Sequence, residues 1–183
     1  MKKLLLLAAL GAASFSSVAM AQDTAPDGSK PFGIEPYVGV LGGYHSFDDD
    51  SEFGTRRGQG PKGVLLSGIA GVNVPLGPVF VGVEGNAGKG FKSIDWEYGV
   101  AAHAGVRAGD SGMFYGSVGY QWVNGRRGFA DHKDWLYGIG MEVGPKDIGL
   151  GGLTGSAGPR LRLQVDTYDM KSIRPMAGVV FHF

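Results

Sequence analysis

A histidine and a serine are adjacent at His45-Ser46, and three aspartates follow at positions 48–50. Nucleophilic catalysis by a serine needs a histidine base within hydrogen-bond reach and an acid that orients the base. The surrounding residues alternate as in a strand, where adjacent side chains point to opposite faces, so His45 and Ser46 cannot easily engage each other. We therefore assign no catalytic residues and expect that the protein is not an enzyme.

The acidic cluster Asp48, Asp49, Asp50 and Glu52 offers the hard oxygen ligands that calcium prefers. It lacks the ligand spacing of a dedicated calcium loop, and Arg56 follows closely. We interpret the cluster as a solvated charge run in a loop. The four histidines are spread along the chain and do not suggest a metal site, so we expect no metal and no cofactor.

The other charged residues follow a regular pattern, in which each one alternates with the apolar residues of its own segment. A strand sends alternate side chains to opposite faces, so one face is apolar and the other is small or charged. A soluble barrel such as a lipocalin would place the apolar face inside, and here the many charges on one face predict the reverse. The predicted interior charge network consists of Glu84, Glu97, His103, Arg107, Glu142, Arg160, Arg162, Asp166 and Arg174.

Eight alternating segments carry this pattern, and we expect each to be a strand. Proline and glycine predict tight turns at 75–78 and 109–112. Polar stretches predict longer loops on the opposite side, at 47–63, 88–94 and 124–134, with a further short connection at 169–172. The connection at 144–158 is longer than a tight turn and remains unassigned. The predicted strands cover about 36–46, 64–74, 79–87, 96–108, 114–122, 135–143, 160–168 and 173–183.

The length of these segments matches a tilted strand that crosses a lipid bilayer. Every backbone group inside a membrane must be hydrogen-bonded within the protein, which an even-stranded closed barrel achieves. The sequence therefore predicts an all-β fold, an eight-stranded antiparallel transmembrane up-and-down β-barrel. A barrel of this size has an interior just wide enough for side chains, so we expect paired ions to fill it. Aromatic residues near the strand ends suit the two membrane interfaces.

The first residues form a processing segment. Lys2 and Lys3 precede an apolar run at positions 4–13, and Ala19-Met20-Ala21 provides a cleavage site for a secretory signal peptide. The predicted domains are a signal peptide at 1–21, a periplasmic leader at 22–34 and the barrel at 35–183. Loss of Lys2 and Lys3 from a balance of 17 basic and 17 acidic residues leaves a net charge of −2, which gives no reason to expect nucleic-acid binding.

Glycine is unusually frequent, at 34 of 183 residues, and no cysteine is present. The glycines show no three-residue period and lie within and between the alternating segments. Glycine inside a strand marks close backbone approach or a small filler in a tight interior. The composition is therefore consistent with a narrow, strongly tilted barrel.

The chain ends on an alternating segment in which Val179, Phe181 and Phe183 share one face. With the strand-one motif at 36–40, Glu84 and Glu142, this ending resembles the small opacity-type, outer-membrane-protein-A-like β-barrels of Gram-negative bacteria. The resemblance implies an outer-membrane location, recognition of Val179, Phe181 and Phe183 by the β-barrel assembly machinery, and a filled lumen. It also implies a role in envelope structure, surface contact or adhesion through external loops, as for a surface antigen.

The expected partners are outer-membrane lipid and lipopolysaccharide, whose phosphates Arg126, Arg127 and Lys133 would contact, and a surface ligand of unknown identity. Two alternatives remain open. A narrow porin-like channel is one, and a filled lumen argues against it. A lipid A-modifying outer-membrane enzyme is the other, although the His-x-Ser spacing of the deacylase type does not occur.

Overall fold

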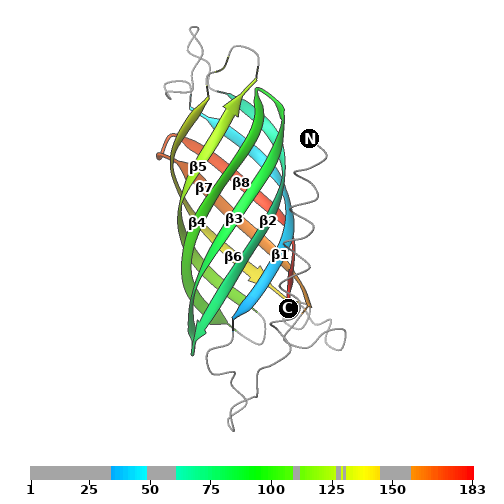
Figure 1. Cartoon of the computed structure of the whole chain (residues 1–183), viewed down its shortest axis with the longest axis vertical. Helices are drawn as coiled ribbons and strands as arrows, with labels where there is room; N and C mark the ends of the chain where they lie inside the picture. The colour runs from blue at the N-terminus through cyan, green and yellow to red at the C-terminus, as the bar shows by residue number, and fades with distance from the viewer. Residues whose placement is uncertain (1–33, 49–60, 109–111, 127–128, 130, 145–157) are drawn as a thin grey trace.

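The computed structural model describes residues 34–48, 61–108, 112–126, 129, 131–144 and 158–183. These residues form a closed barrel in which strands β1 to β8 are neighbours in chain order (Figure 1). Each strand pairs antiparallel with the next, and β8 pairs with β1. The strands are β1 (Glu35–Phe47), β2 (Lys62–Leu76), β3 (Val79–Lys92), β4 (Ile94–Ala108), β5 (Gly112–Gly125), β6 (His132–Val143), β7 (Gly158–Tyr168) and β8 (Ser172–His182).

The barrel closes where the two ends of the described chain meet. Tyr37 lies opposite His182 and Val40 lies opposite Val179 in the β1–β8 ladder. The backbone amide of Phe183 donates to the carbonyl of Pro36 at 3.0 Å. We call this rim the terminal end of the barrel, and the opposite rim, where β1–β2, β3–β4, β5–β6 and β7–β8 are connected, the loop end.

The outer surface is apolar on every strand. Residues that alternate along a strand, such as Val79, Val81 and Val83 on β3, are each more than 40% exposed. Near the loop end, aromatic rings on neighbouring strands contact each other. Tyr98 stacks on Trp122 with 5.6 Å between the ring centres, and Tyr120 meets Trp135 edge to face at 5.7 Å. No helix among the described residues is long and apolar enough to cross a membrane.

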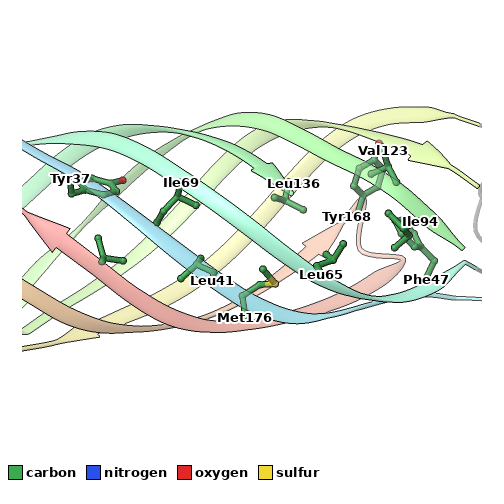
Figure 2. Packing of buried hydrophobic residues seen from close by; sticks show 11 residues of the cluster. Tyr37, Leu41, Phe47, Leu65, Ile69, Ile94, Val123, Leu136, Tyr168 and Met176 are labelled. Carbon is green, nitrogen blue, oxygen red and sulfur yellow. The ribbon is translucent and has the colours of Figure 1, made fainter. Parts of the chain in front are cut away.

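The interior also contains large apolar side chains, which the sequence analysis did not place there as a group. Phe47, Ile94, Val123 and Tyr168 are each 2% exposed or less and lie together near the loop end (Figure 2). Figure 2 shows Leu41, Leu65 and Met176 nearer the middle of the barrel. Apolar layers therefore lie between the charged groups and toward the loop end.

The strands extend beyond the predicted segments, and the predicted loop at 88–94 is wrong. β3 continues to Lys92 and β4 begins at Ile94, so only Ser93 separates them. Lys92 has a positive φ of 135°, which allows the sharp reversal. The turn at 75–78 narrows to Gly77 and Pro78, where Gly77 has a φ of 76°. The predicted signal peptide, most of the leader, and most of the connections at 47–63, 109–112 and 144–158 lie outside the described residues.

Glycines on the inner face leave no room for a side chain. A Cβ on Gly178 would lie 2.7 Å from the Cα of Leu41, and one on Gly119 would lie 2.6 Å from the carbonyl oxygen of Val100. Glycines on the outer face are different, since a Cβ on Gly68 would find its nearest neighbour at 4.0 Å. The inner glycines therefore allow the walls and side chains of a narrow barrel to fit together.

Candidate functional site

The interior holds two groups of ionisable side chains, one nearer to each end. The loop-end cluster consists of His45, Glu97, Asp166 and Arg174, which come from β1, β4, β7 and β8. The terminal-end cluster consists of Glu84, Glu142, Arg162 and His182, from β3, β6, β7 and β8. All eight side chains point inward because the two-residue period of their strands places them opposite the apolar outer face.

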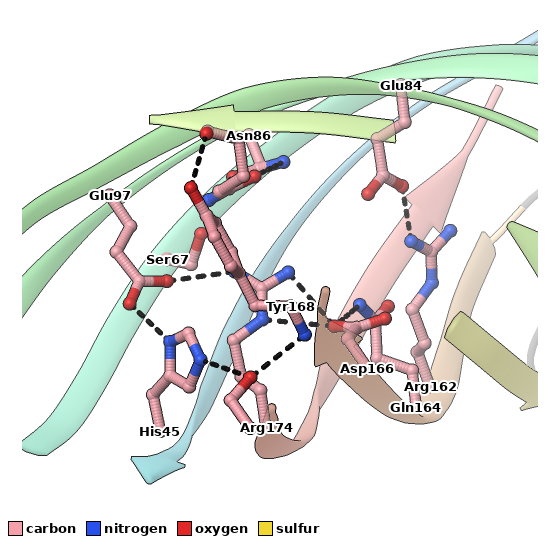
Figure 3. Close-up of polar contacts among 12 residues, drawn as sticks. His45, Ser67, Glu84, Asn86, Glu97, Arg162, Gln164, Asp166, Tyr168 and Arg174 are labelled. Carbon is pink, nitrogen blue, oxygen red and sulfur yellow. Dashed lines mark hydrogen bonds and ion pairs between the residues drawn. The ribbon is translucent and has the colours of Figure 1, made fainter. Parts of the chain in front are cut away.

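In the loop-end cluster, Arg174 bridges two carboxylates. Its Nη1 donates to Glu97 at 2.9 Å, and its Nε and Nη2 donate to Oδ2 of Asp166 at 3.1 and 2.9 Å (Figure 3). The other oxygen of Glu97 lies 2.5 Å from Nδ1 of His45. Arg174, Glu97 and Asp166 are all less than 8% exposed, so each charge depends on its partners.

In the terminal-end cluster, Arg162 bridges Glu84 and Glu142. Its Nε and Nη2 donate to Glu142 at 2.8 and 2.5 Å, and its Nη1 donates to Glu84. The second oxygen of Glu142 lies 2.7 Å from Nε2 of His182, and the hydroxyl of Tyr37 donates to Glu84 at 2.8 Å. Every carboxylate therefore has at least two donors, which offsets the cost of burial.

Two hydrogen bonds and a cation–π contact link the two clusters. The side-chain amide of Gln164 donates to Asp166 at 2.9 Å, and its oxygen accepts from the hydroxyl of Tyr115 at 3.3 Å. The ring of Tyr115 lies 5.4 Å from the guanidinium carbon of Arg162. Asn86 and Gln121 add a second polar layer, where each amide donates to the oxygen of the other at 3.2 and 2.9 Å. The polar groups therefore occupy the barrel at several levels.

Three residues of the predicted network lie apart from these clusters. Nε2 of His103 bonds to Asn73 at 2.7 Å, and no hydrogen bond joins it to Glu97 or Arg107 among the described residues. Arg107 lies at the terminal end, where Nη2 donates to Glu35 at 2.5 Å and its side chain is 30% exposed. Arg160 is buried at 7% exposure near the same end.

The sequence analysis missed the two histidines that complete the clusters. Alternation places His45 and His182 on the inner face, so their direction was available from the sequence. Their hydrogen-bond partners could not be predicted, because Glu97 lies 52 residues from His45 and Glu142 lies 40 residues from His182. Alternation also places Tyr37 on the inner face, where its hydroxyl donates to Glu84.

His45 makes a second contact, with a residue that the sequence analysis did not consider. Its Nε2 lies 3.0 Å from the hydroxyl oxygen of Ser172, which is 127 residues away in the chain. Ser172 begins β8, directly after a turn in which Asp169 and Met170 have positive φ angles of 46° and 55°. The hydroxyl oxygen of Ser172 also accepts the backbone N–H of Tyr168 at 2.9 Å. Ser172, His45 and Glu97 therefore form a hydrogen-bonded row.

Structures with the same arrangement of strands include designed and natural barrels. A de novo designed transmembrane β-barrel is 13% identical, with 85% of this chain and 98% of that chain covered and a TM-score of 0.50. Ail, the attachment invasion locus protein of Yersinia pestis, solved with the heparin analogue sucrose octasulfate, is 15% identical, with 82% and 97% covered and a TM-score of 0.50. Neisserial surface protein A is 13% identical, with 82% and 97% covered and a TM-score of 0.47.

No protein-family model and no curated protein matches the sequence. Identities at this level establish the fold alone. The chain has the fold of the eight-stranded outer-membrane β-barrels, as the sequence predicted.

Proposed function

We propose that the protein is an integral β-barrel of the bacterial outer membrane, exported with a cleaved signal peptide, and of the opacity-type, outer-membrane-protein-A-like kind. The observation that carries the proposal is the division between the two faces of the wall. Exposed valines, leucines and aromatic residues cover the outside, whereas Arg162, Arg174 and their carboxylate partners are buried inside. Water would disfavour such an outer surface, and lipid would match it.

The role that we propose is envelope structure or surface contact, with the connections at the loop end facing the outside of the cell. The buried ion pairs and the apolar layers stiffen the wall, so the barrel is suited to hold external loops in fixed positions. Ail, described as an attachment invasion locus protein, shows that this fold also occurs in a protein of that kind. The partners in this proposal are outer-membrane lipid, lipopolysaccharide, the β-barrel assembly machinery and an unidentified surface ligand, with no nucleic acid.

Cell fractionation and gel mobility test the membrane assignment. The full chain, expressed with its own leader in a Gram-negative host, should appear in the outer-membrane fraction. It should also migrate differently on a denaturing gel before and after boiling, as expected of a closed barrel that resists detergent. Recovery of the folded protein in the soluble periplasmic fraction would contradict the assignment.

Binding of intact cells to a panel of surfaces tests the proposed role. Variants in which residues 49–60 or 126–131, which lie between the strands, are replaced by short glycine-serine linkers should reach the outer membrane and lose surface binding. Equal binding by cells with and without these connections would exclude surface contact through them and leave the structural role.

A further inference from the structure

We infer that Ser172, His45 and Glu97 form a catalytic triad that hydrolyses acyl esters of membrane lipids at the loop end of the barrel. The inference goes beyond the proposed function, and its substrate class rests on the membrane location proposed above. It also differs from the expectation of no catalysis, which considered Ser46 as the partner of His45.

The atoms that face each other are those that a serine hydrolase uses. Nδ1 of His45 lies 2.5 Å from Glu97, and Nε2 on the far side of the ring lies 3.0 Å from the hydroxyl oxygen of Ser172. An ionised Glu97 accepts from Nδ1, which therefore carries a proton. In the neutral ring Nε2 is the acceptor for the Ser172 hydroxyl, and this is the tautomer that a general base requires.

The surroundings favour this tautomer and the transfer of the serine proton. Arg174 donates to the other oxygen of Glu97 at 2.9 Å, which holds the carboxylate in position. The ring of His45 is fully buried and stacks on Phe47 with 4.1 Å between the ring centres. The backbone N–H of Tyr168 donates to the Ser172 oxygen at 2.9 Å, which fixes the rotamer of the hydroxyl facing His45.

The position of Ser172 in the fold suits a nucleophile. His45 and Glu97 are buried, whereas Ser172 is half-buried at the rim of the barrel. Two consecutive non-glycine residues in the left-handed region, Asp169 and Met170, precede it in the turn. Two consecutive residues of this kind form a type I′ turn, which the backbone amide of Lys171 closes on the carbonyl of Tyr168 at 2.9 Å. The short hairpin turn therefore fixes the position of Ser172 at the start of β8.

The outer wall supplies a place for an acyl chain. A groove of about 880 Å³, lined mainly by apolar residues, crosses the outer face from β3 to the start of β8. Small residues on β4 and β5, Ala102, Ala104 and Gly116, line it, and its far end is formed by Met170, Ser172 and Ile173. The groove lies on the lipid-facing side of the wall and fits the hydrocarbon tail of a lipid. The hydroxyl of Ser172 faces the interior, so the ester group of that lipid would have to cross the rim to reach it.

The level of this rim matches the position of lipid ester groups. The β7–β8 turn is short, and Figure 1 shows it lower on the barrel than the ends of β3 and β4. The backbone amide of Asp169 bonds to the carbonyl of Trp135, one of the aromatic residues near the loop end. Lys133 is exposed two residues further along β6 on the same outer face, where it can meet a phosphate of the lipid headgroup.

The reaction is ester hydrolysis in two steps. The Ser172 oxygen bonds to the acyl carbonyl carbon as its proton moves to Nε2 of His45, and the bond to the alcohol oxygen breaks as that proton passes to the leaving alcohol. Water then attacks the acyl-serine with His45 as base, which releases a fatty acid and restores the serine. Glu97 acts as a positioning residue because it orients His45 and does not touch the substrate.

Covalent labelling with a fluorophosphonate tests the triad without a lipid substrate. The full chain in detergent micelles should acquire the label at Ser172, located by peptide mass spectrometry. Ser172→Ala should abolish the label, His45→Gln should slow labelling at least about hundredfold, and the nearby control Ser46→Ala should label normally. Glu97→Gln should slow labelling and change its pH profile. The boiling-dependent shift in gel mobility verifies that each variant is folded, and Ser172→Cys, which keeps a side-chain acceptor, provides a second test if Ser172→Ala does not fold.

Fatty-acid release tests the substrate class. Protein in vesicles of phosphatidylethanolamine and phosphatidylglycerol is compared with protein in vesicles that also contain lipopolysaccharide, so that the two lipid sources are separated. We expect release in at least one set and none from Ser172→Ala. A protein that labels at Ser172 but releases no fatty acid from either set overturns the lipid-ester assignment. Absence of the label from the folded wild-type protein overturns the triad, and both results leave the membrane location untouched.

Discussion

Arg162 is the side chain on which the terminal-end cluster depends. It is 3% exposed and donates to Glu84 and Glu142, which lie on two other strands. Burial of an unpaired carboxylate destabilises the folded state, and a guanidinium between two carboxylates stabilises both of them. His182 and Tyr37 provide further contacts to the same carboxylates, and neither can replace the charge.

Replacement of Arg162 by methionine should therefore lower the free energy of unfolding by about 3–5 kcal/mol. Unfolding by urea in lipid vesicles, followed by tryptophan fluorescence, measures the change. Arg107→Met is the matched control, because Arg107 is 30% exposed and its pair with Glu35 lies at the rim. The control substitution should lower the free energy of unfolding by no more than about 1 kcal/mol. An equal loss of stability in both variants would contradict the role assigned to Arg162.

Glycine has different consequences on the two faces of one wall. A Cβ on Gly178 would meet the backbone of Leu41 at 2.7 Å, whereas one on Gly68 finds open space to 4.0 Å. Gly178→Ala should therefore destabilise the barrel by about 1–3 kcal/mol through overpacking. Gly68→Ala should stabilise it by about 0.5–1 kcal/mol, since alanine loses less backbone freedom in a strand. The same urea titration checks both, and a loss of stability in Gly68→Ala would show that the outer wall needs that glycine for another contact.

At the scale of the element, each strand is a two-sided unit, and its sides were readable in the sequence. The alternation that placed Glu84, Glu142 and Arg162 on one face and the valines on the other agrees with the structure. The three charged side chains are at most 10% exposed, and the valines of β3 are more than 40% exposed. The ends of the strands were predicted less accurately. Residues 88–94 were expected to form a loop, because the glycines and lysines there do not alternate with apolar residues. The pairing of side chains was out of reach, since the contact of His45 with Glu97 depends on the tilt and stagger of β1 and β4 around a closed wall.

The last strand carries the proposed assembly signal on its outer face. Phe181 and Phe183 are 48% and 53% exposed, so neither is needed to fill the interior. Phe183→Ser should reduce the amount of folded protein in the outer membrane severalfold while the purified chain still refolds in detergent. Ile173→Ser, on the same face of β8 and 56% exposed, is the control and should assemble normally. Equal assembly of the two variants would argue against the signal.

At the scale of the whole molecule, the filled interior predicts the absence of a steady pore. The loop-end and terminal-end clusters, the Asn86–Gln121 pair and the apolar layer around Phe47 and Tyr168 occupy successive levels of the barrel. Purified protein in planar lipid bilayers should give no stepwise current above that of a detergent control. Regular conductance steps from the wild-type protein would favour the channel alternative, and their loss on boiling would show that the folded barrel carries them.

The seam between β1 and β8 has a consequence for how the chain can be cut and rejoined. Because the amide of Phe183 donates to the carbonyl of Pro36, the start of β1 and the end of β8 lie side by side. A linker of a few residues can therefore join positions 35 and 183. New chain termini can then be placed at Gly77, in the β2–β3 turn, without loss of a backbone hydrogen bond between strands. A permuted chain of this kind would keep all eight strand pairings. Removal of β1 or β8 would instead leave two unpaired strand edges and an open barrel.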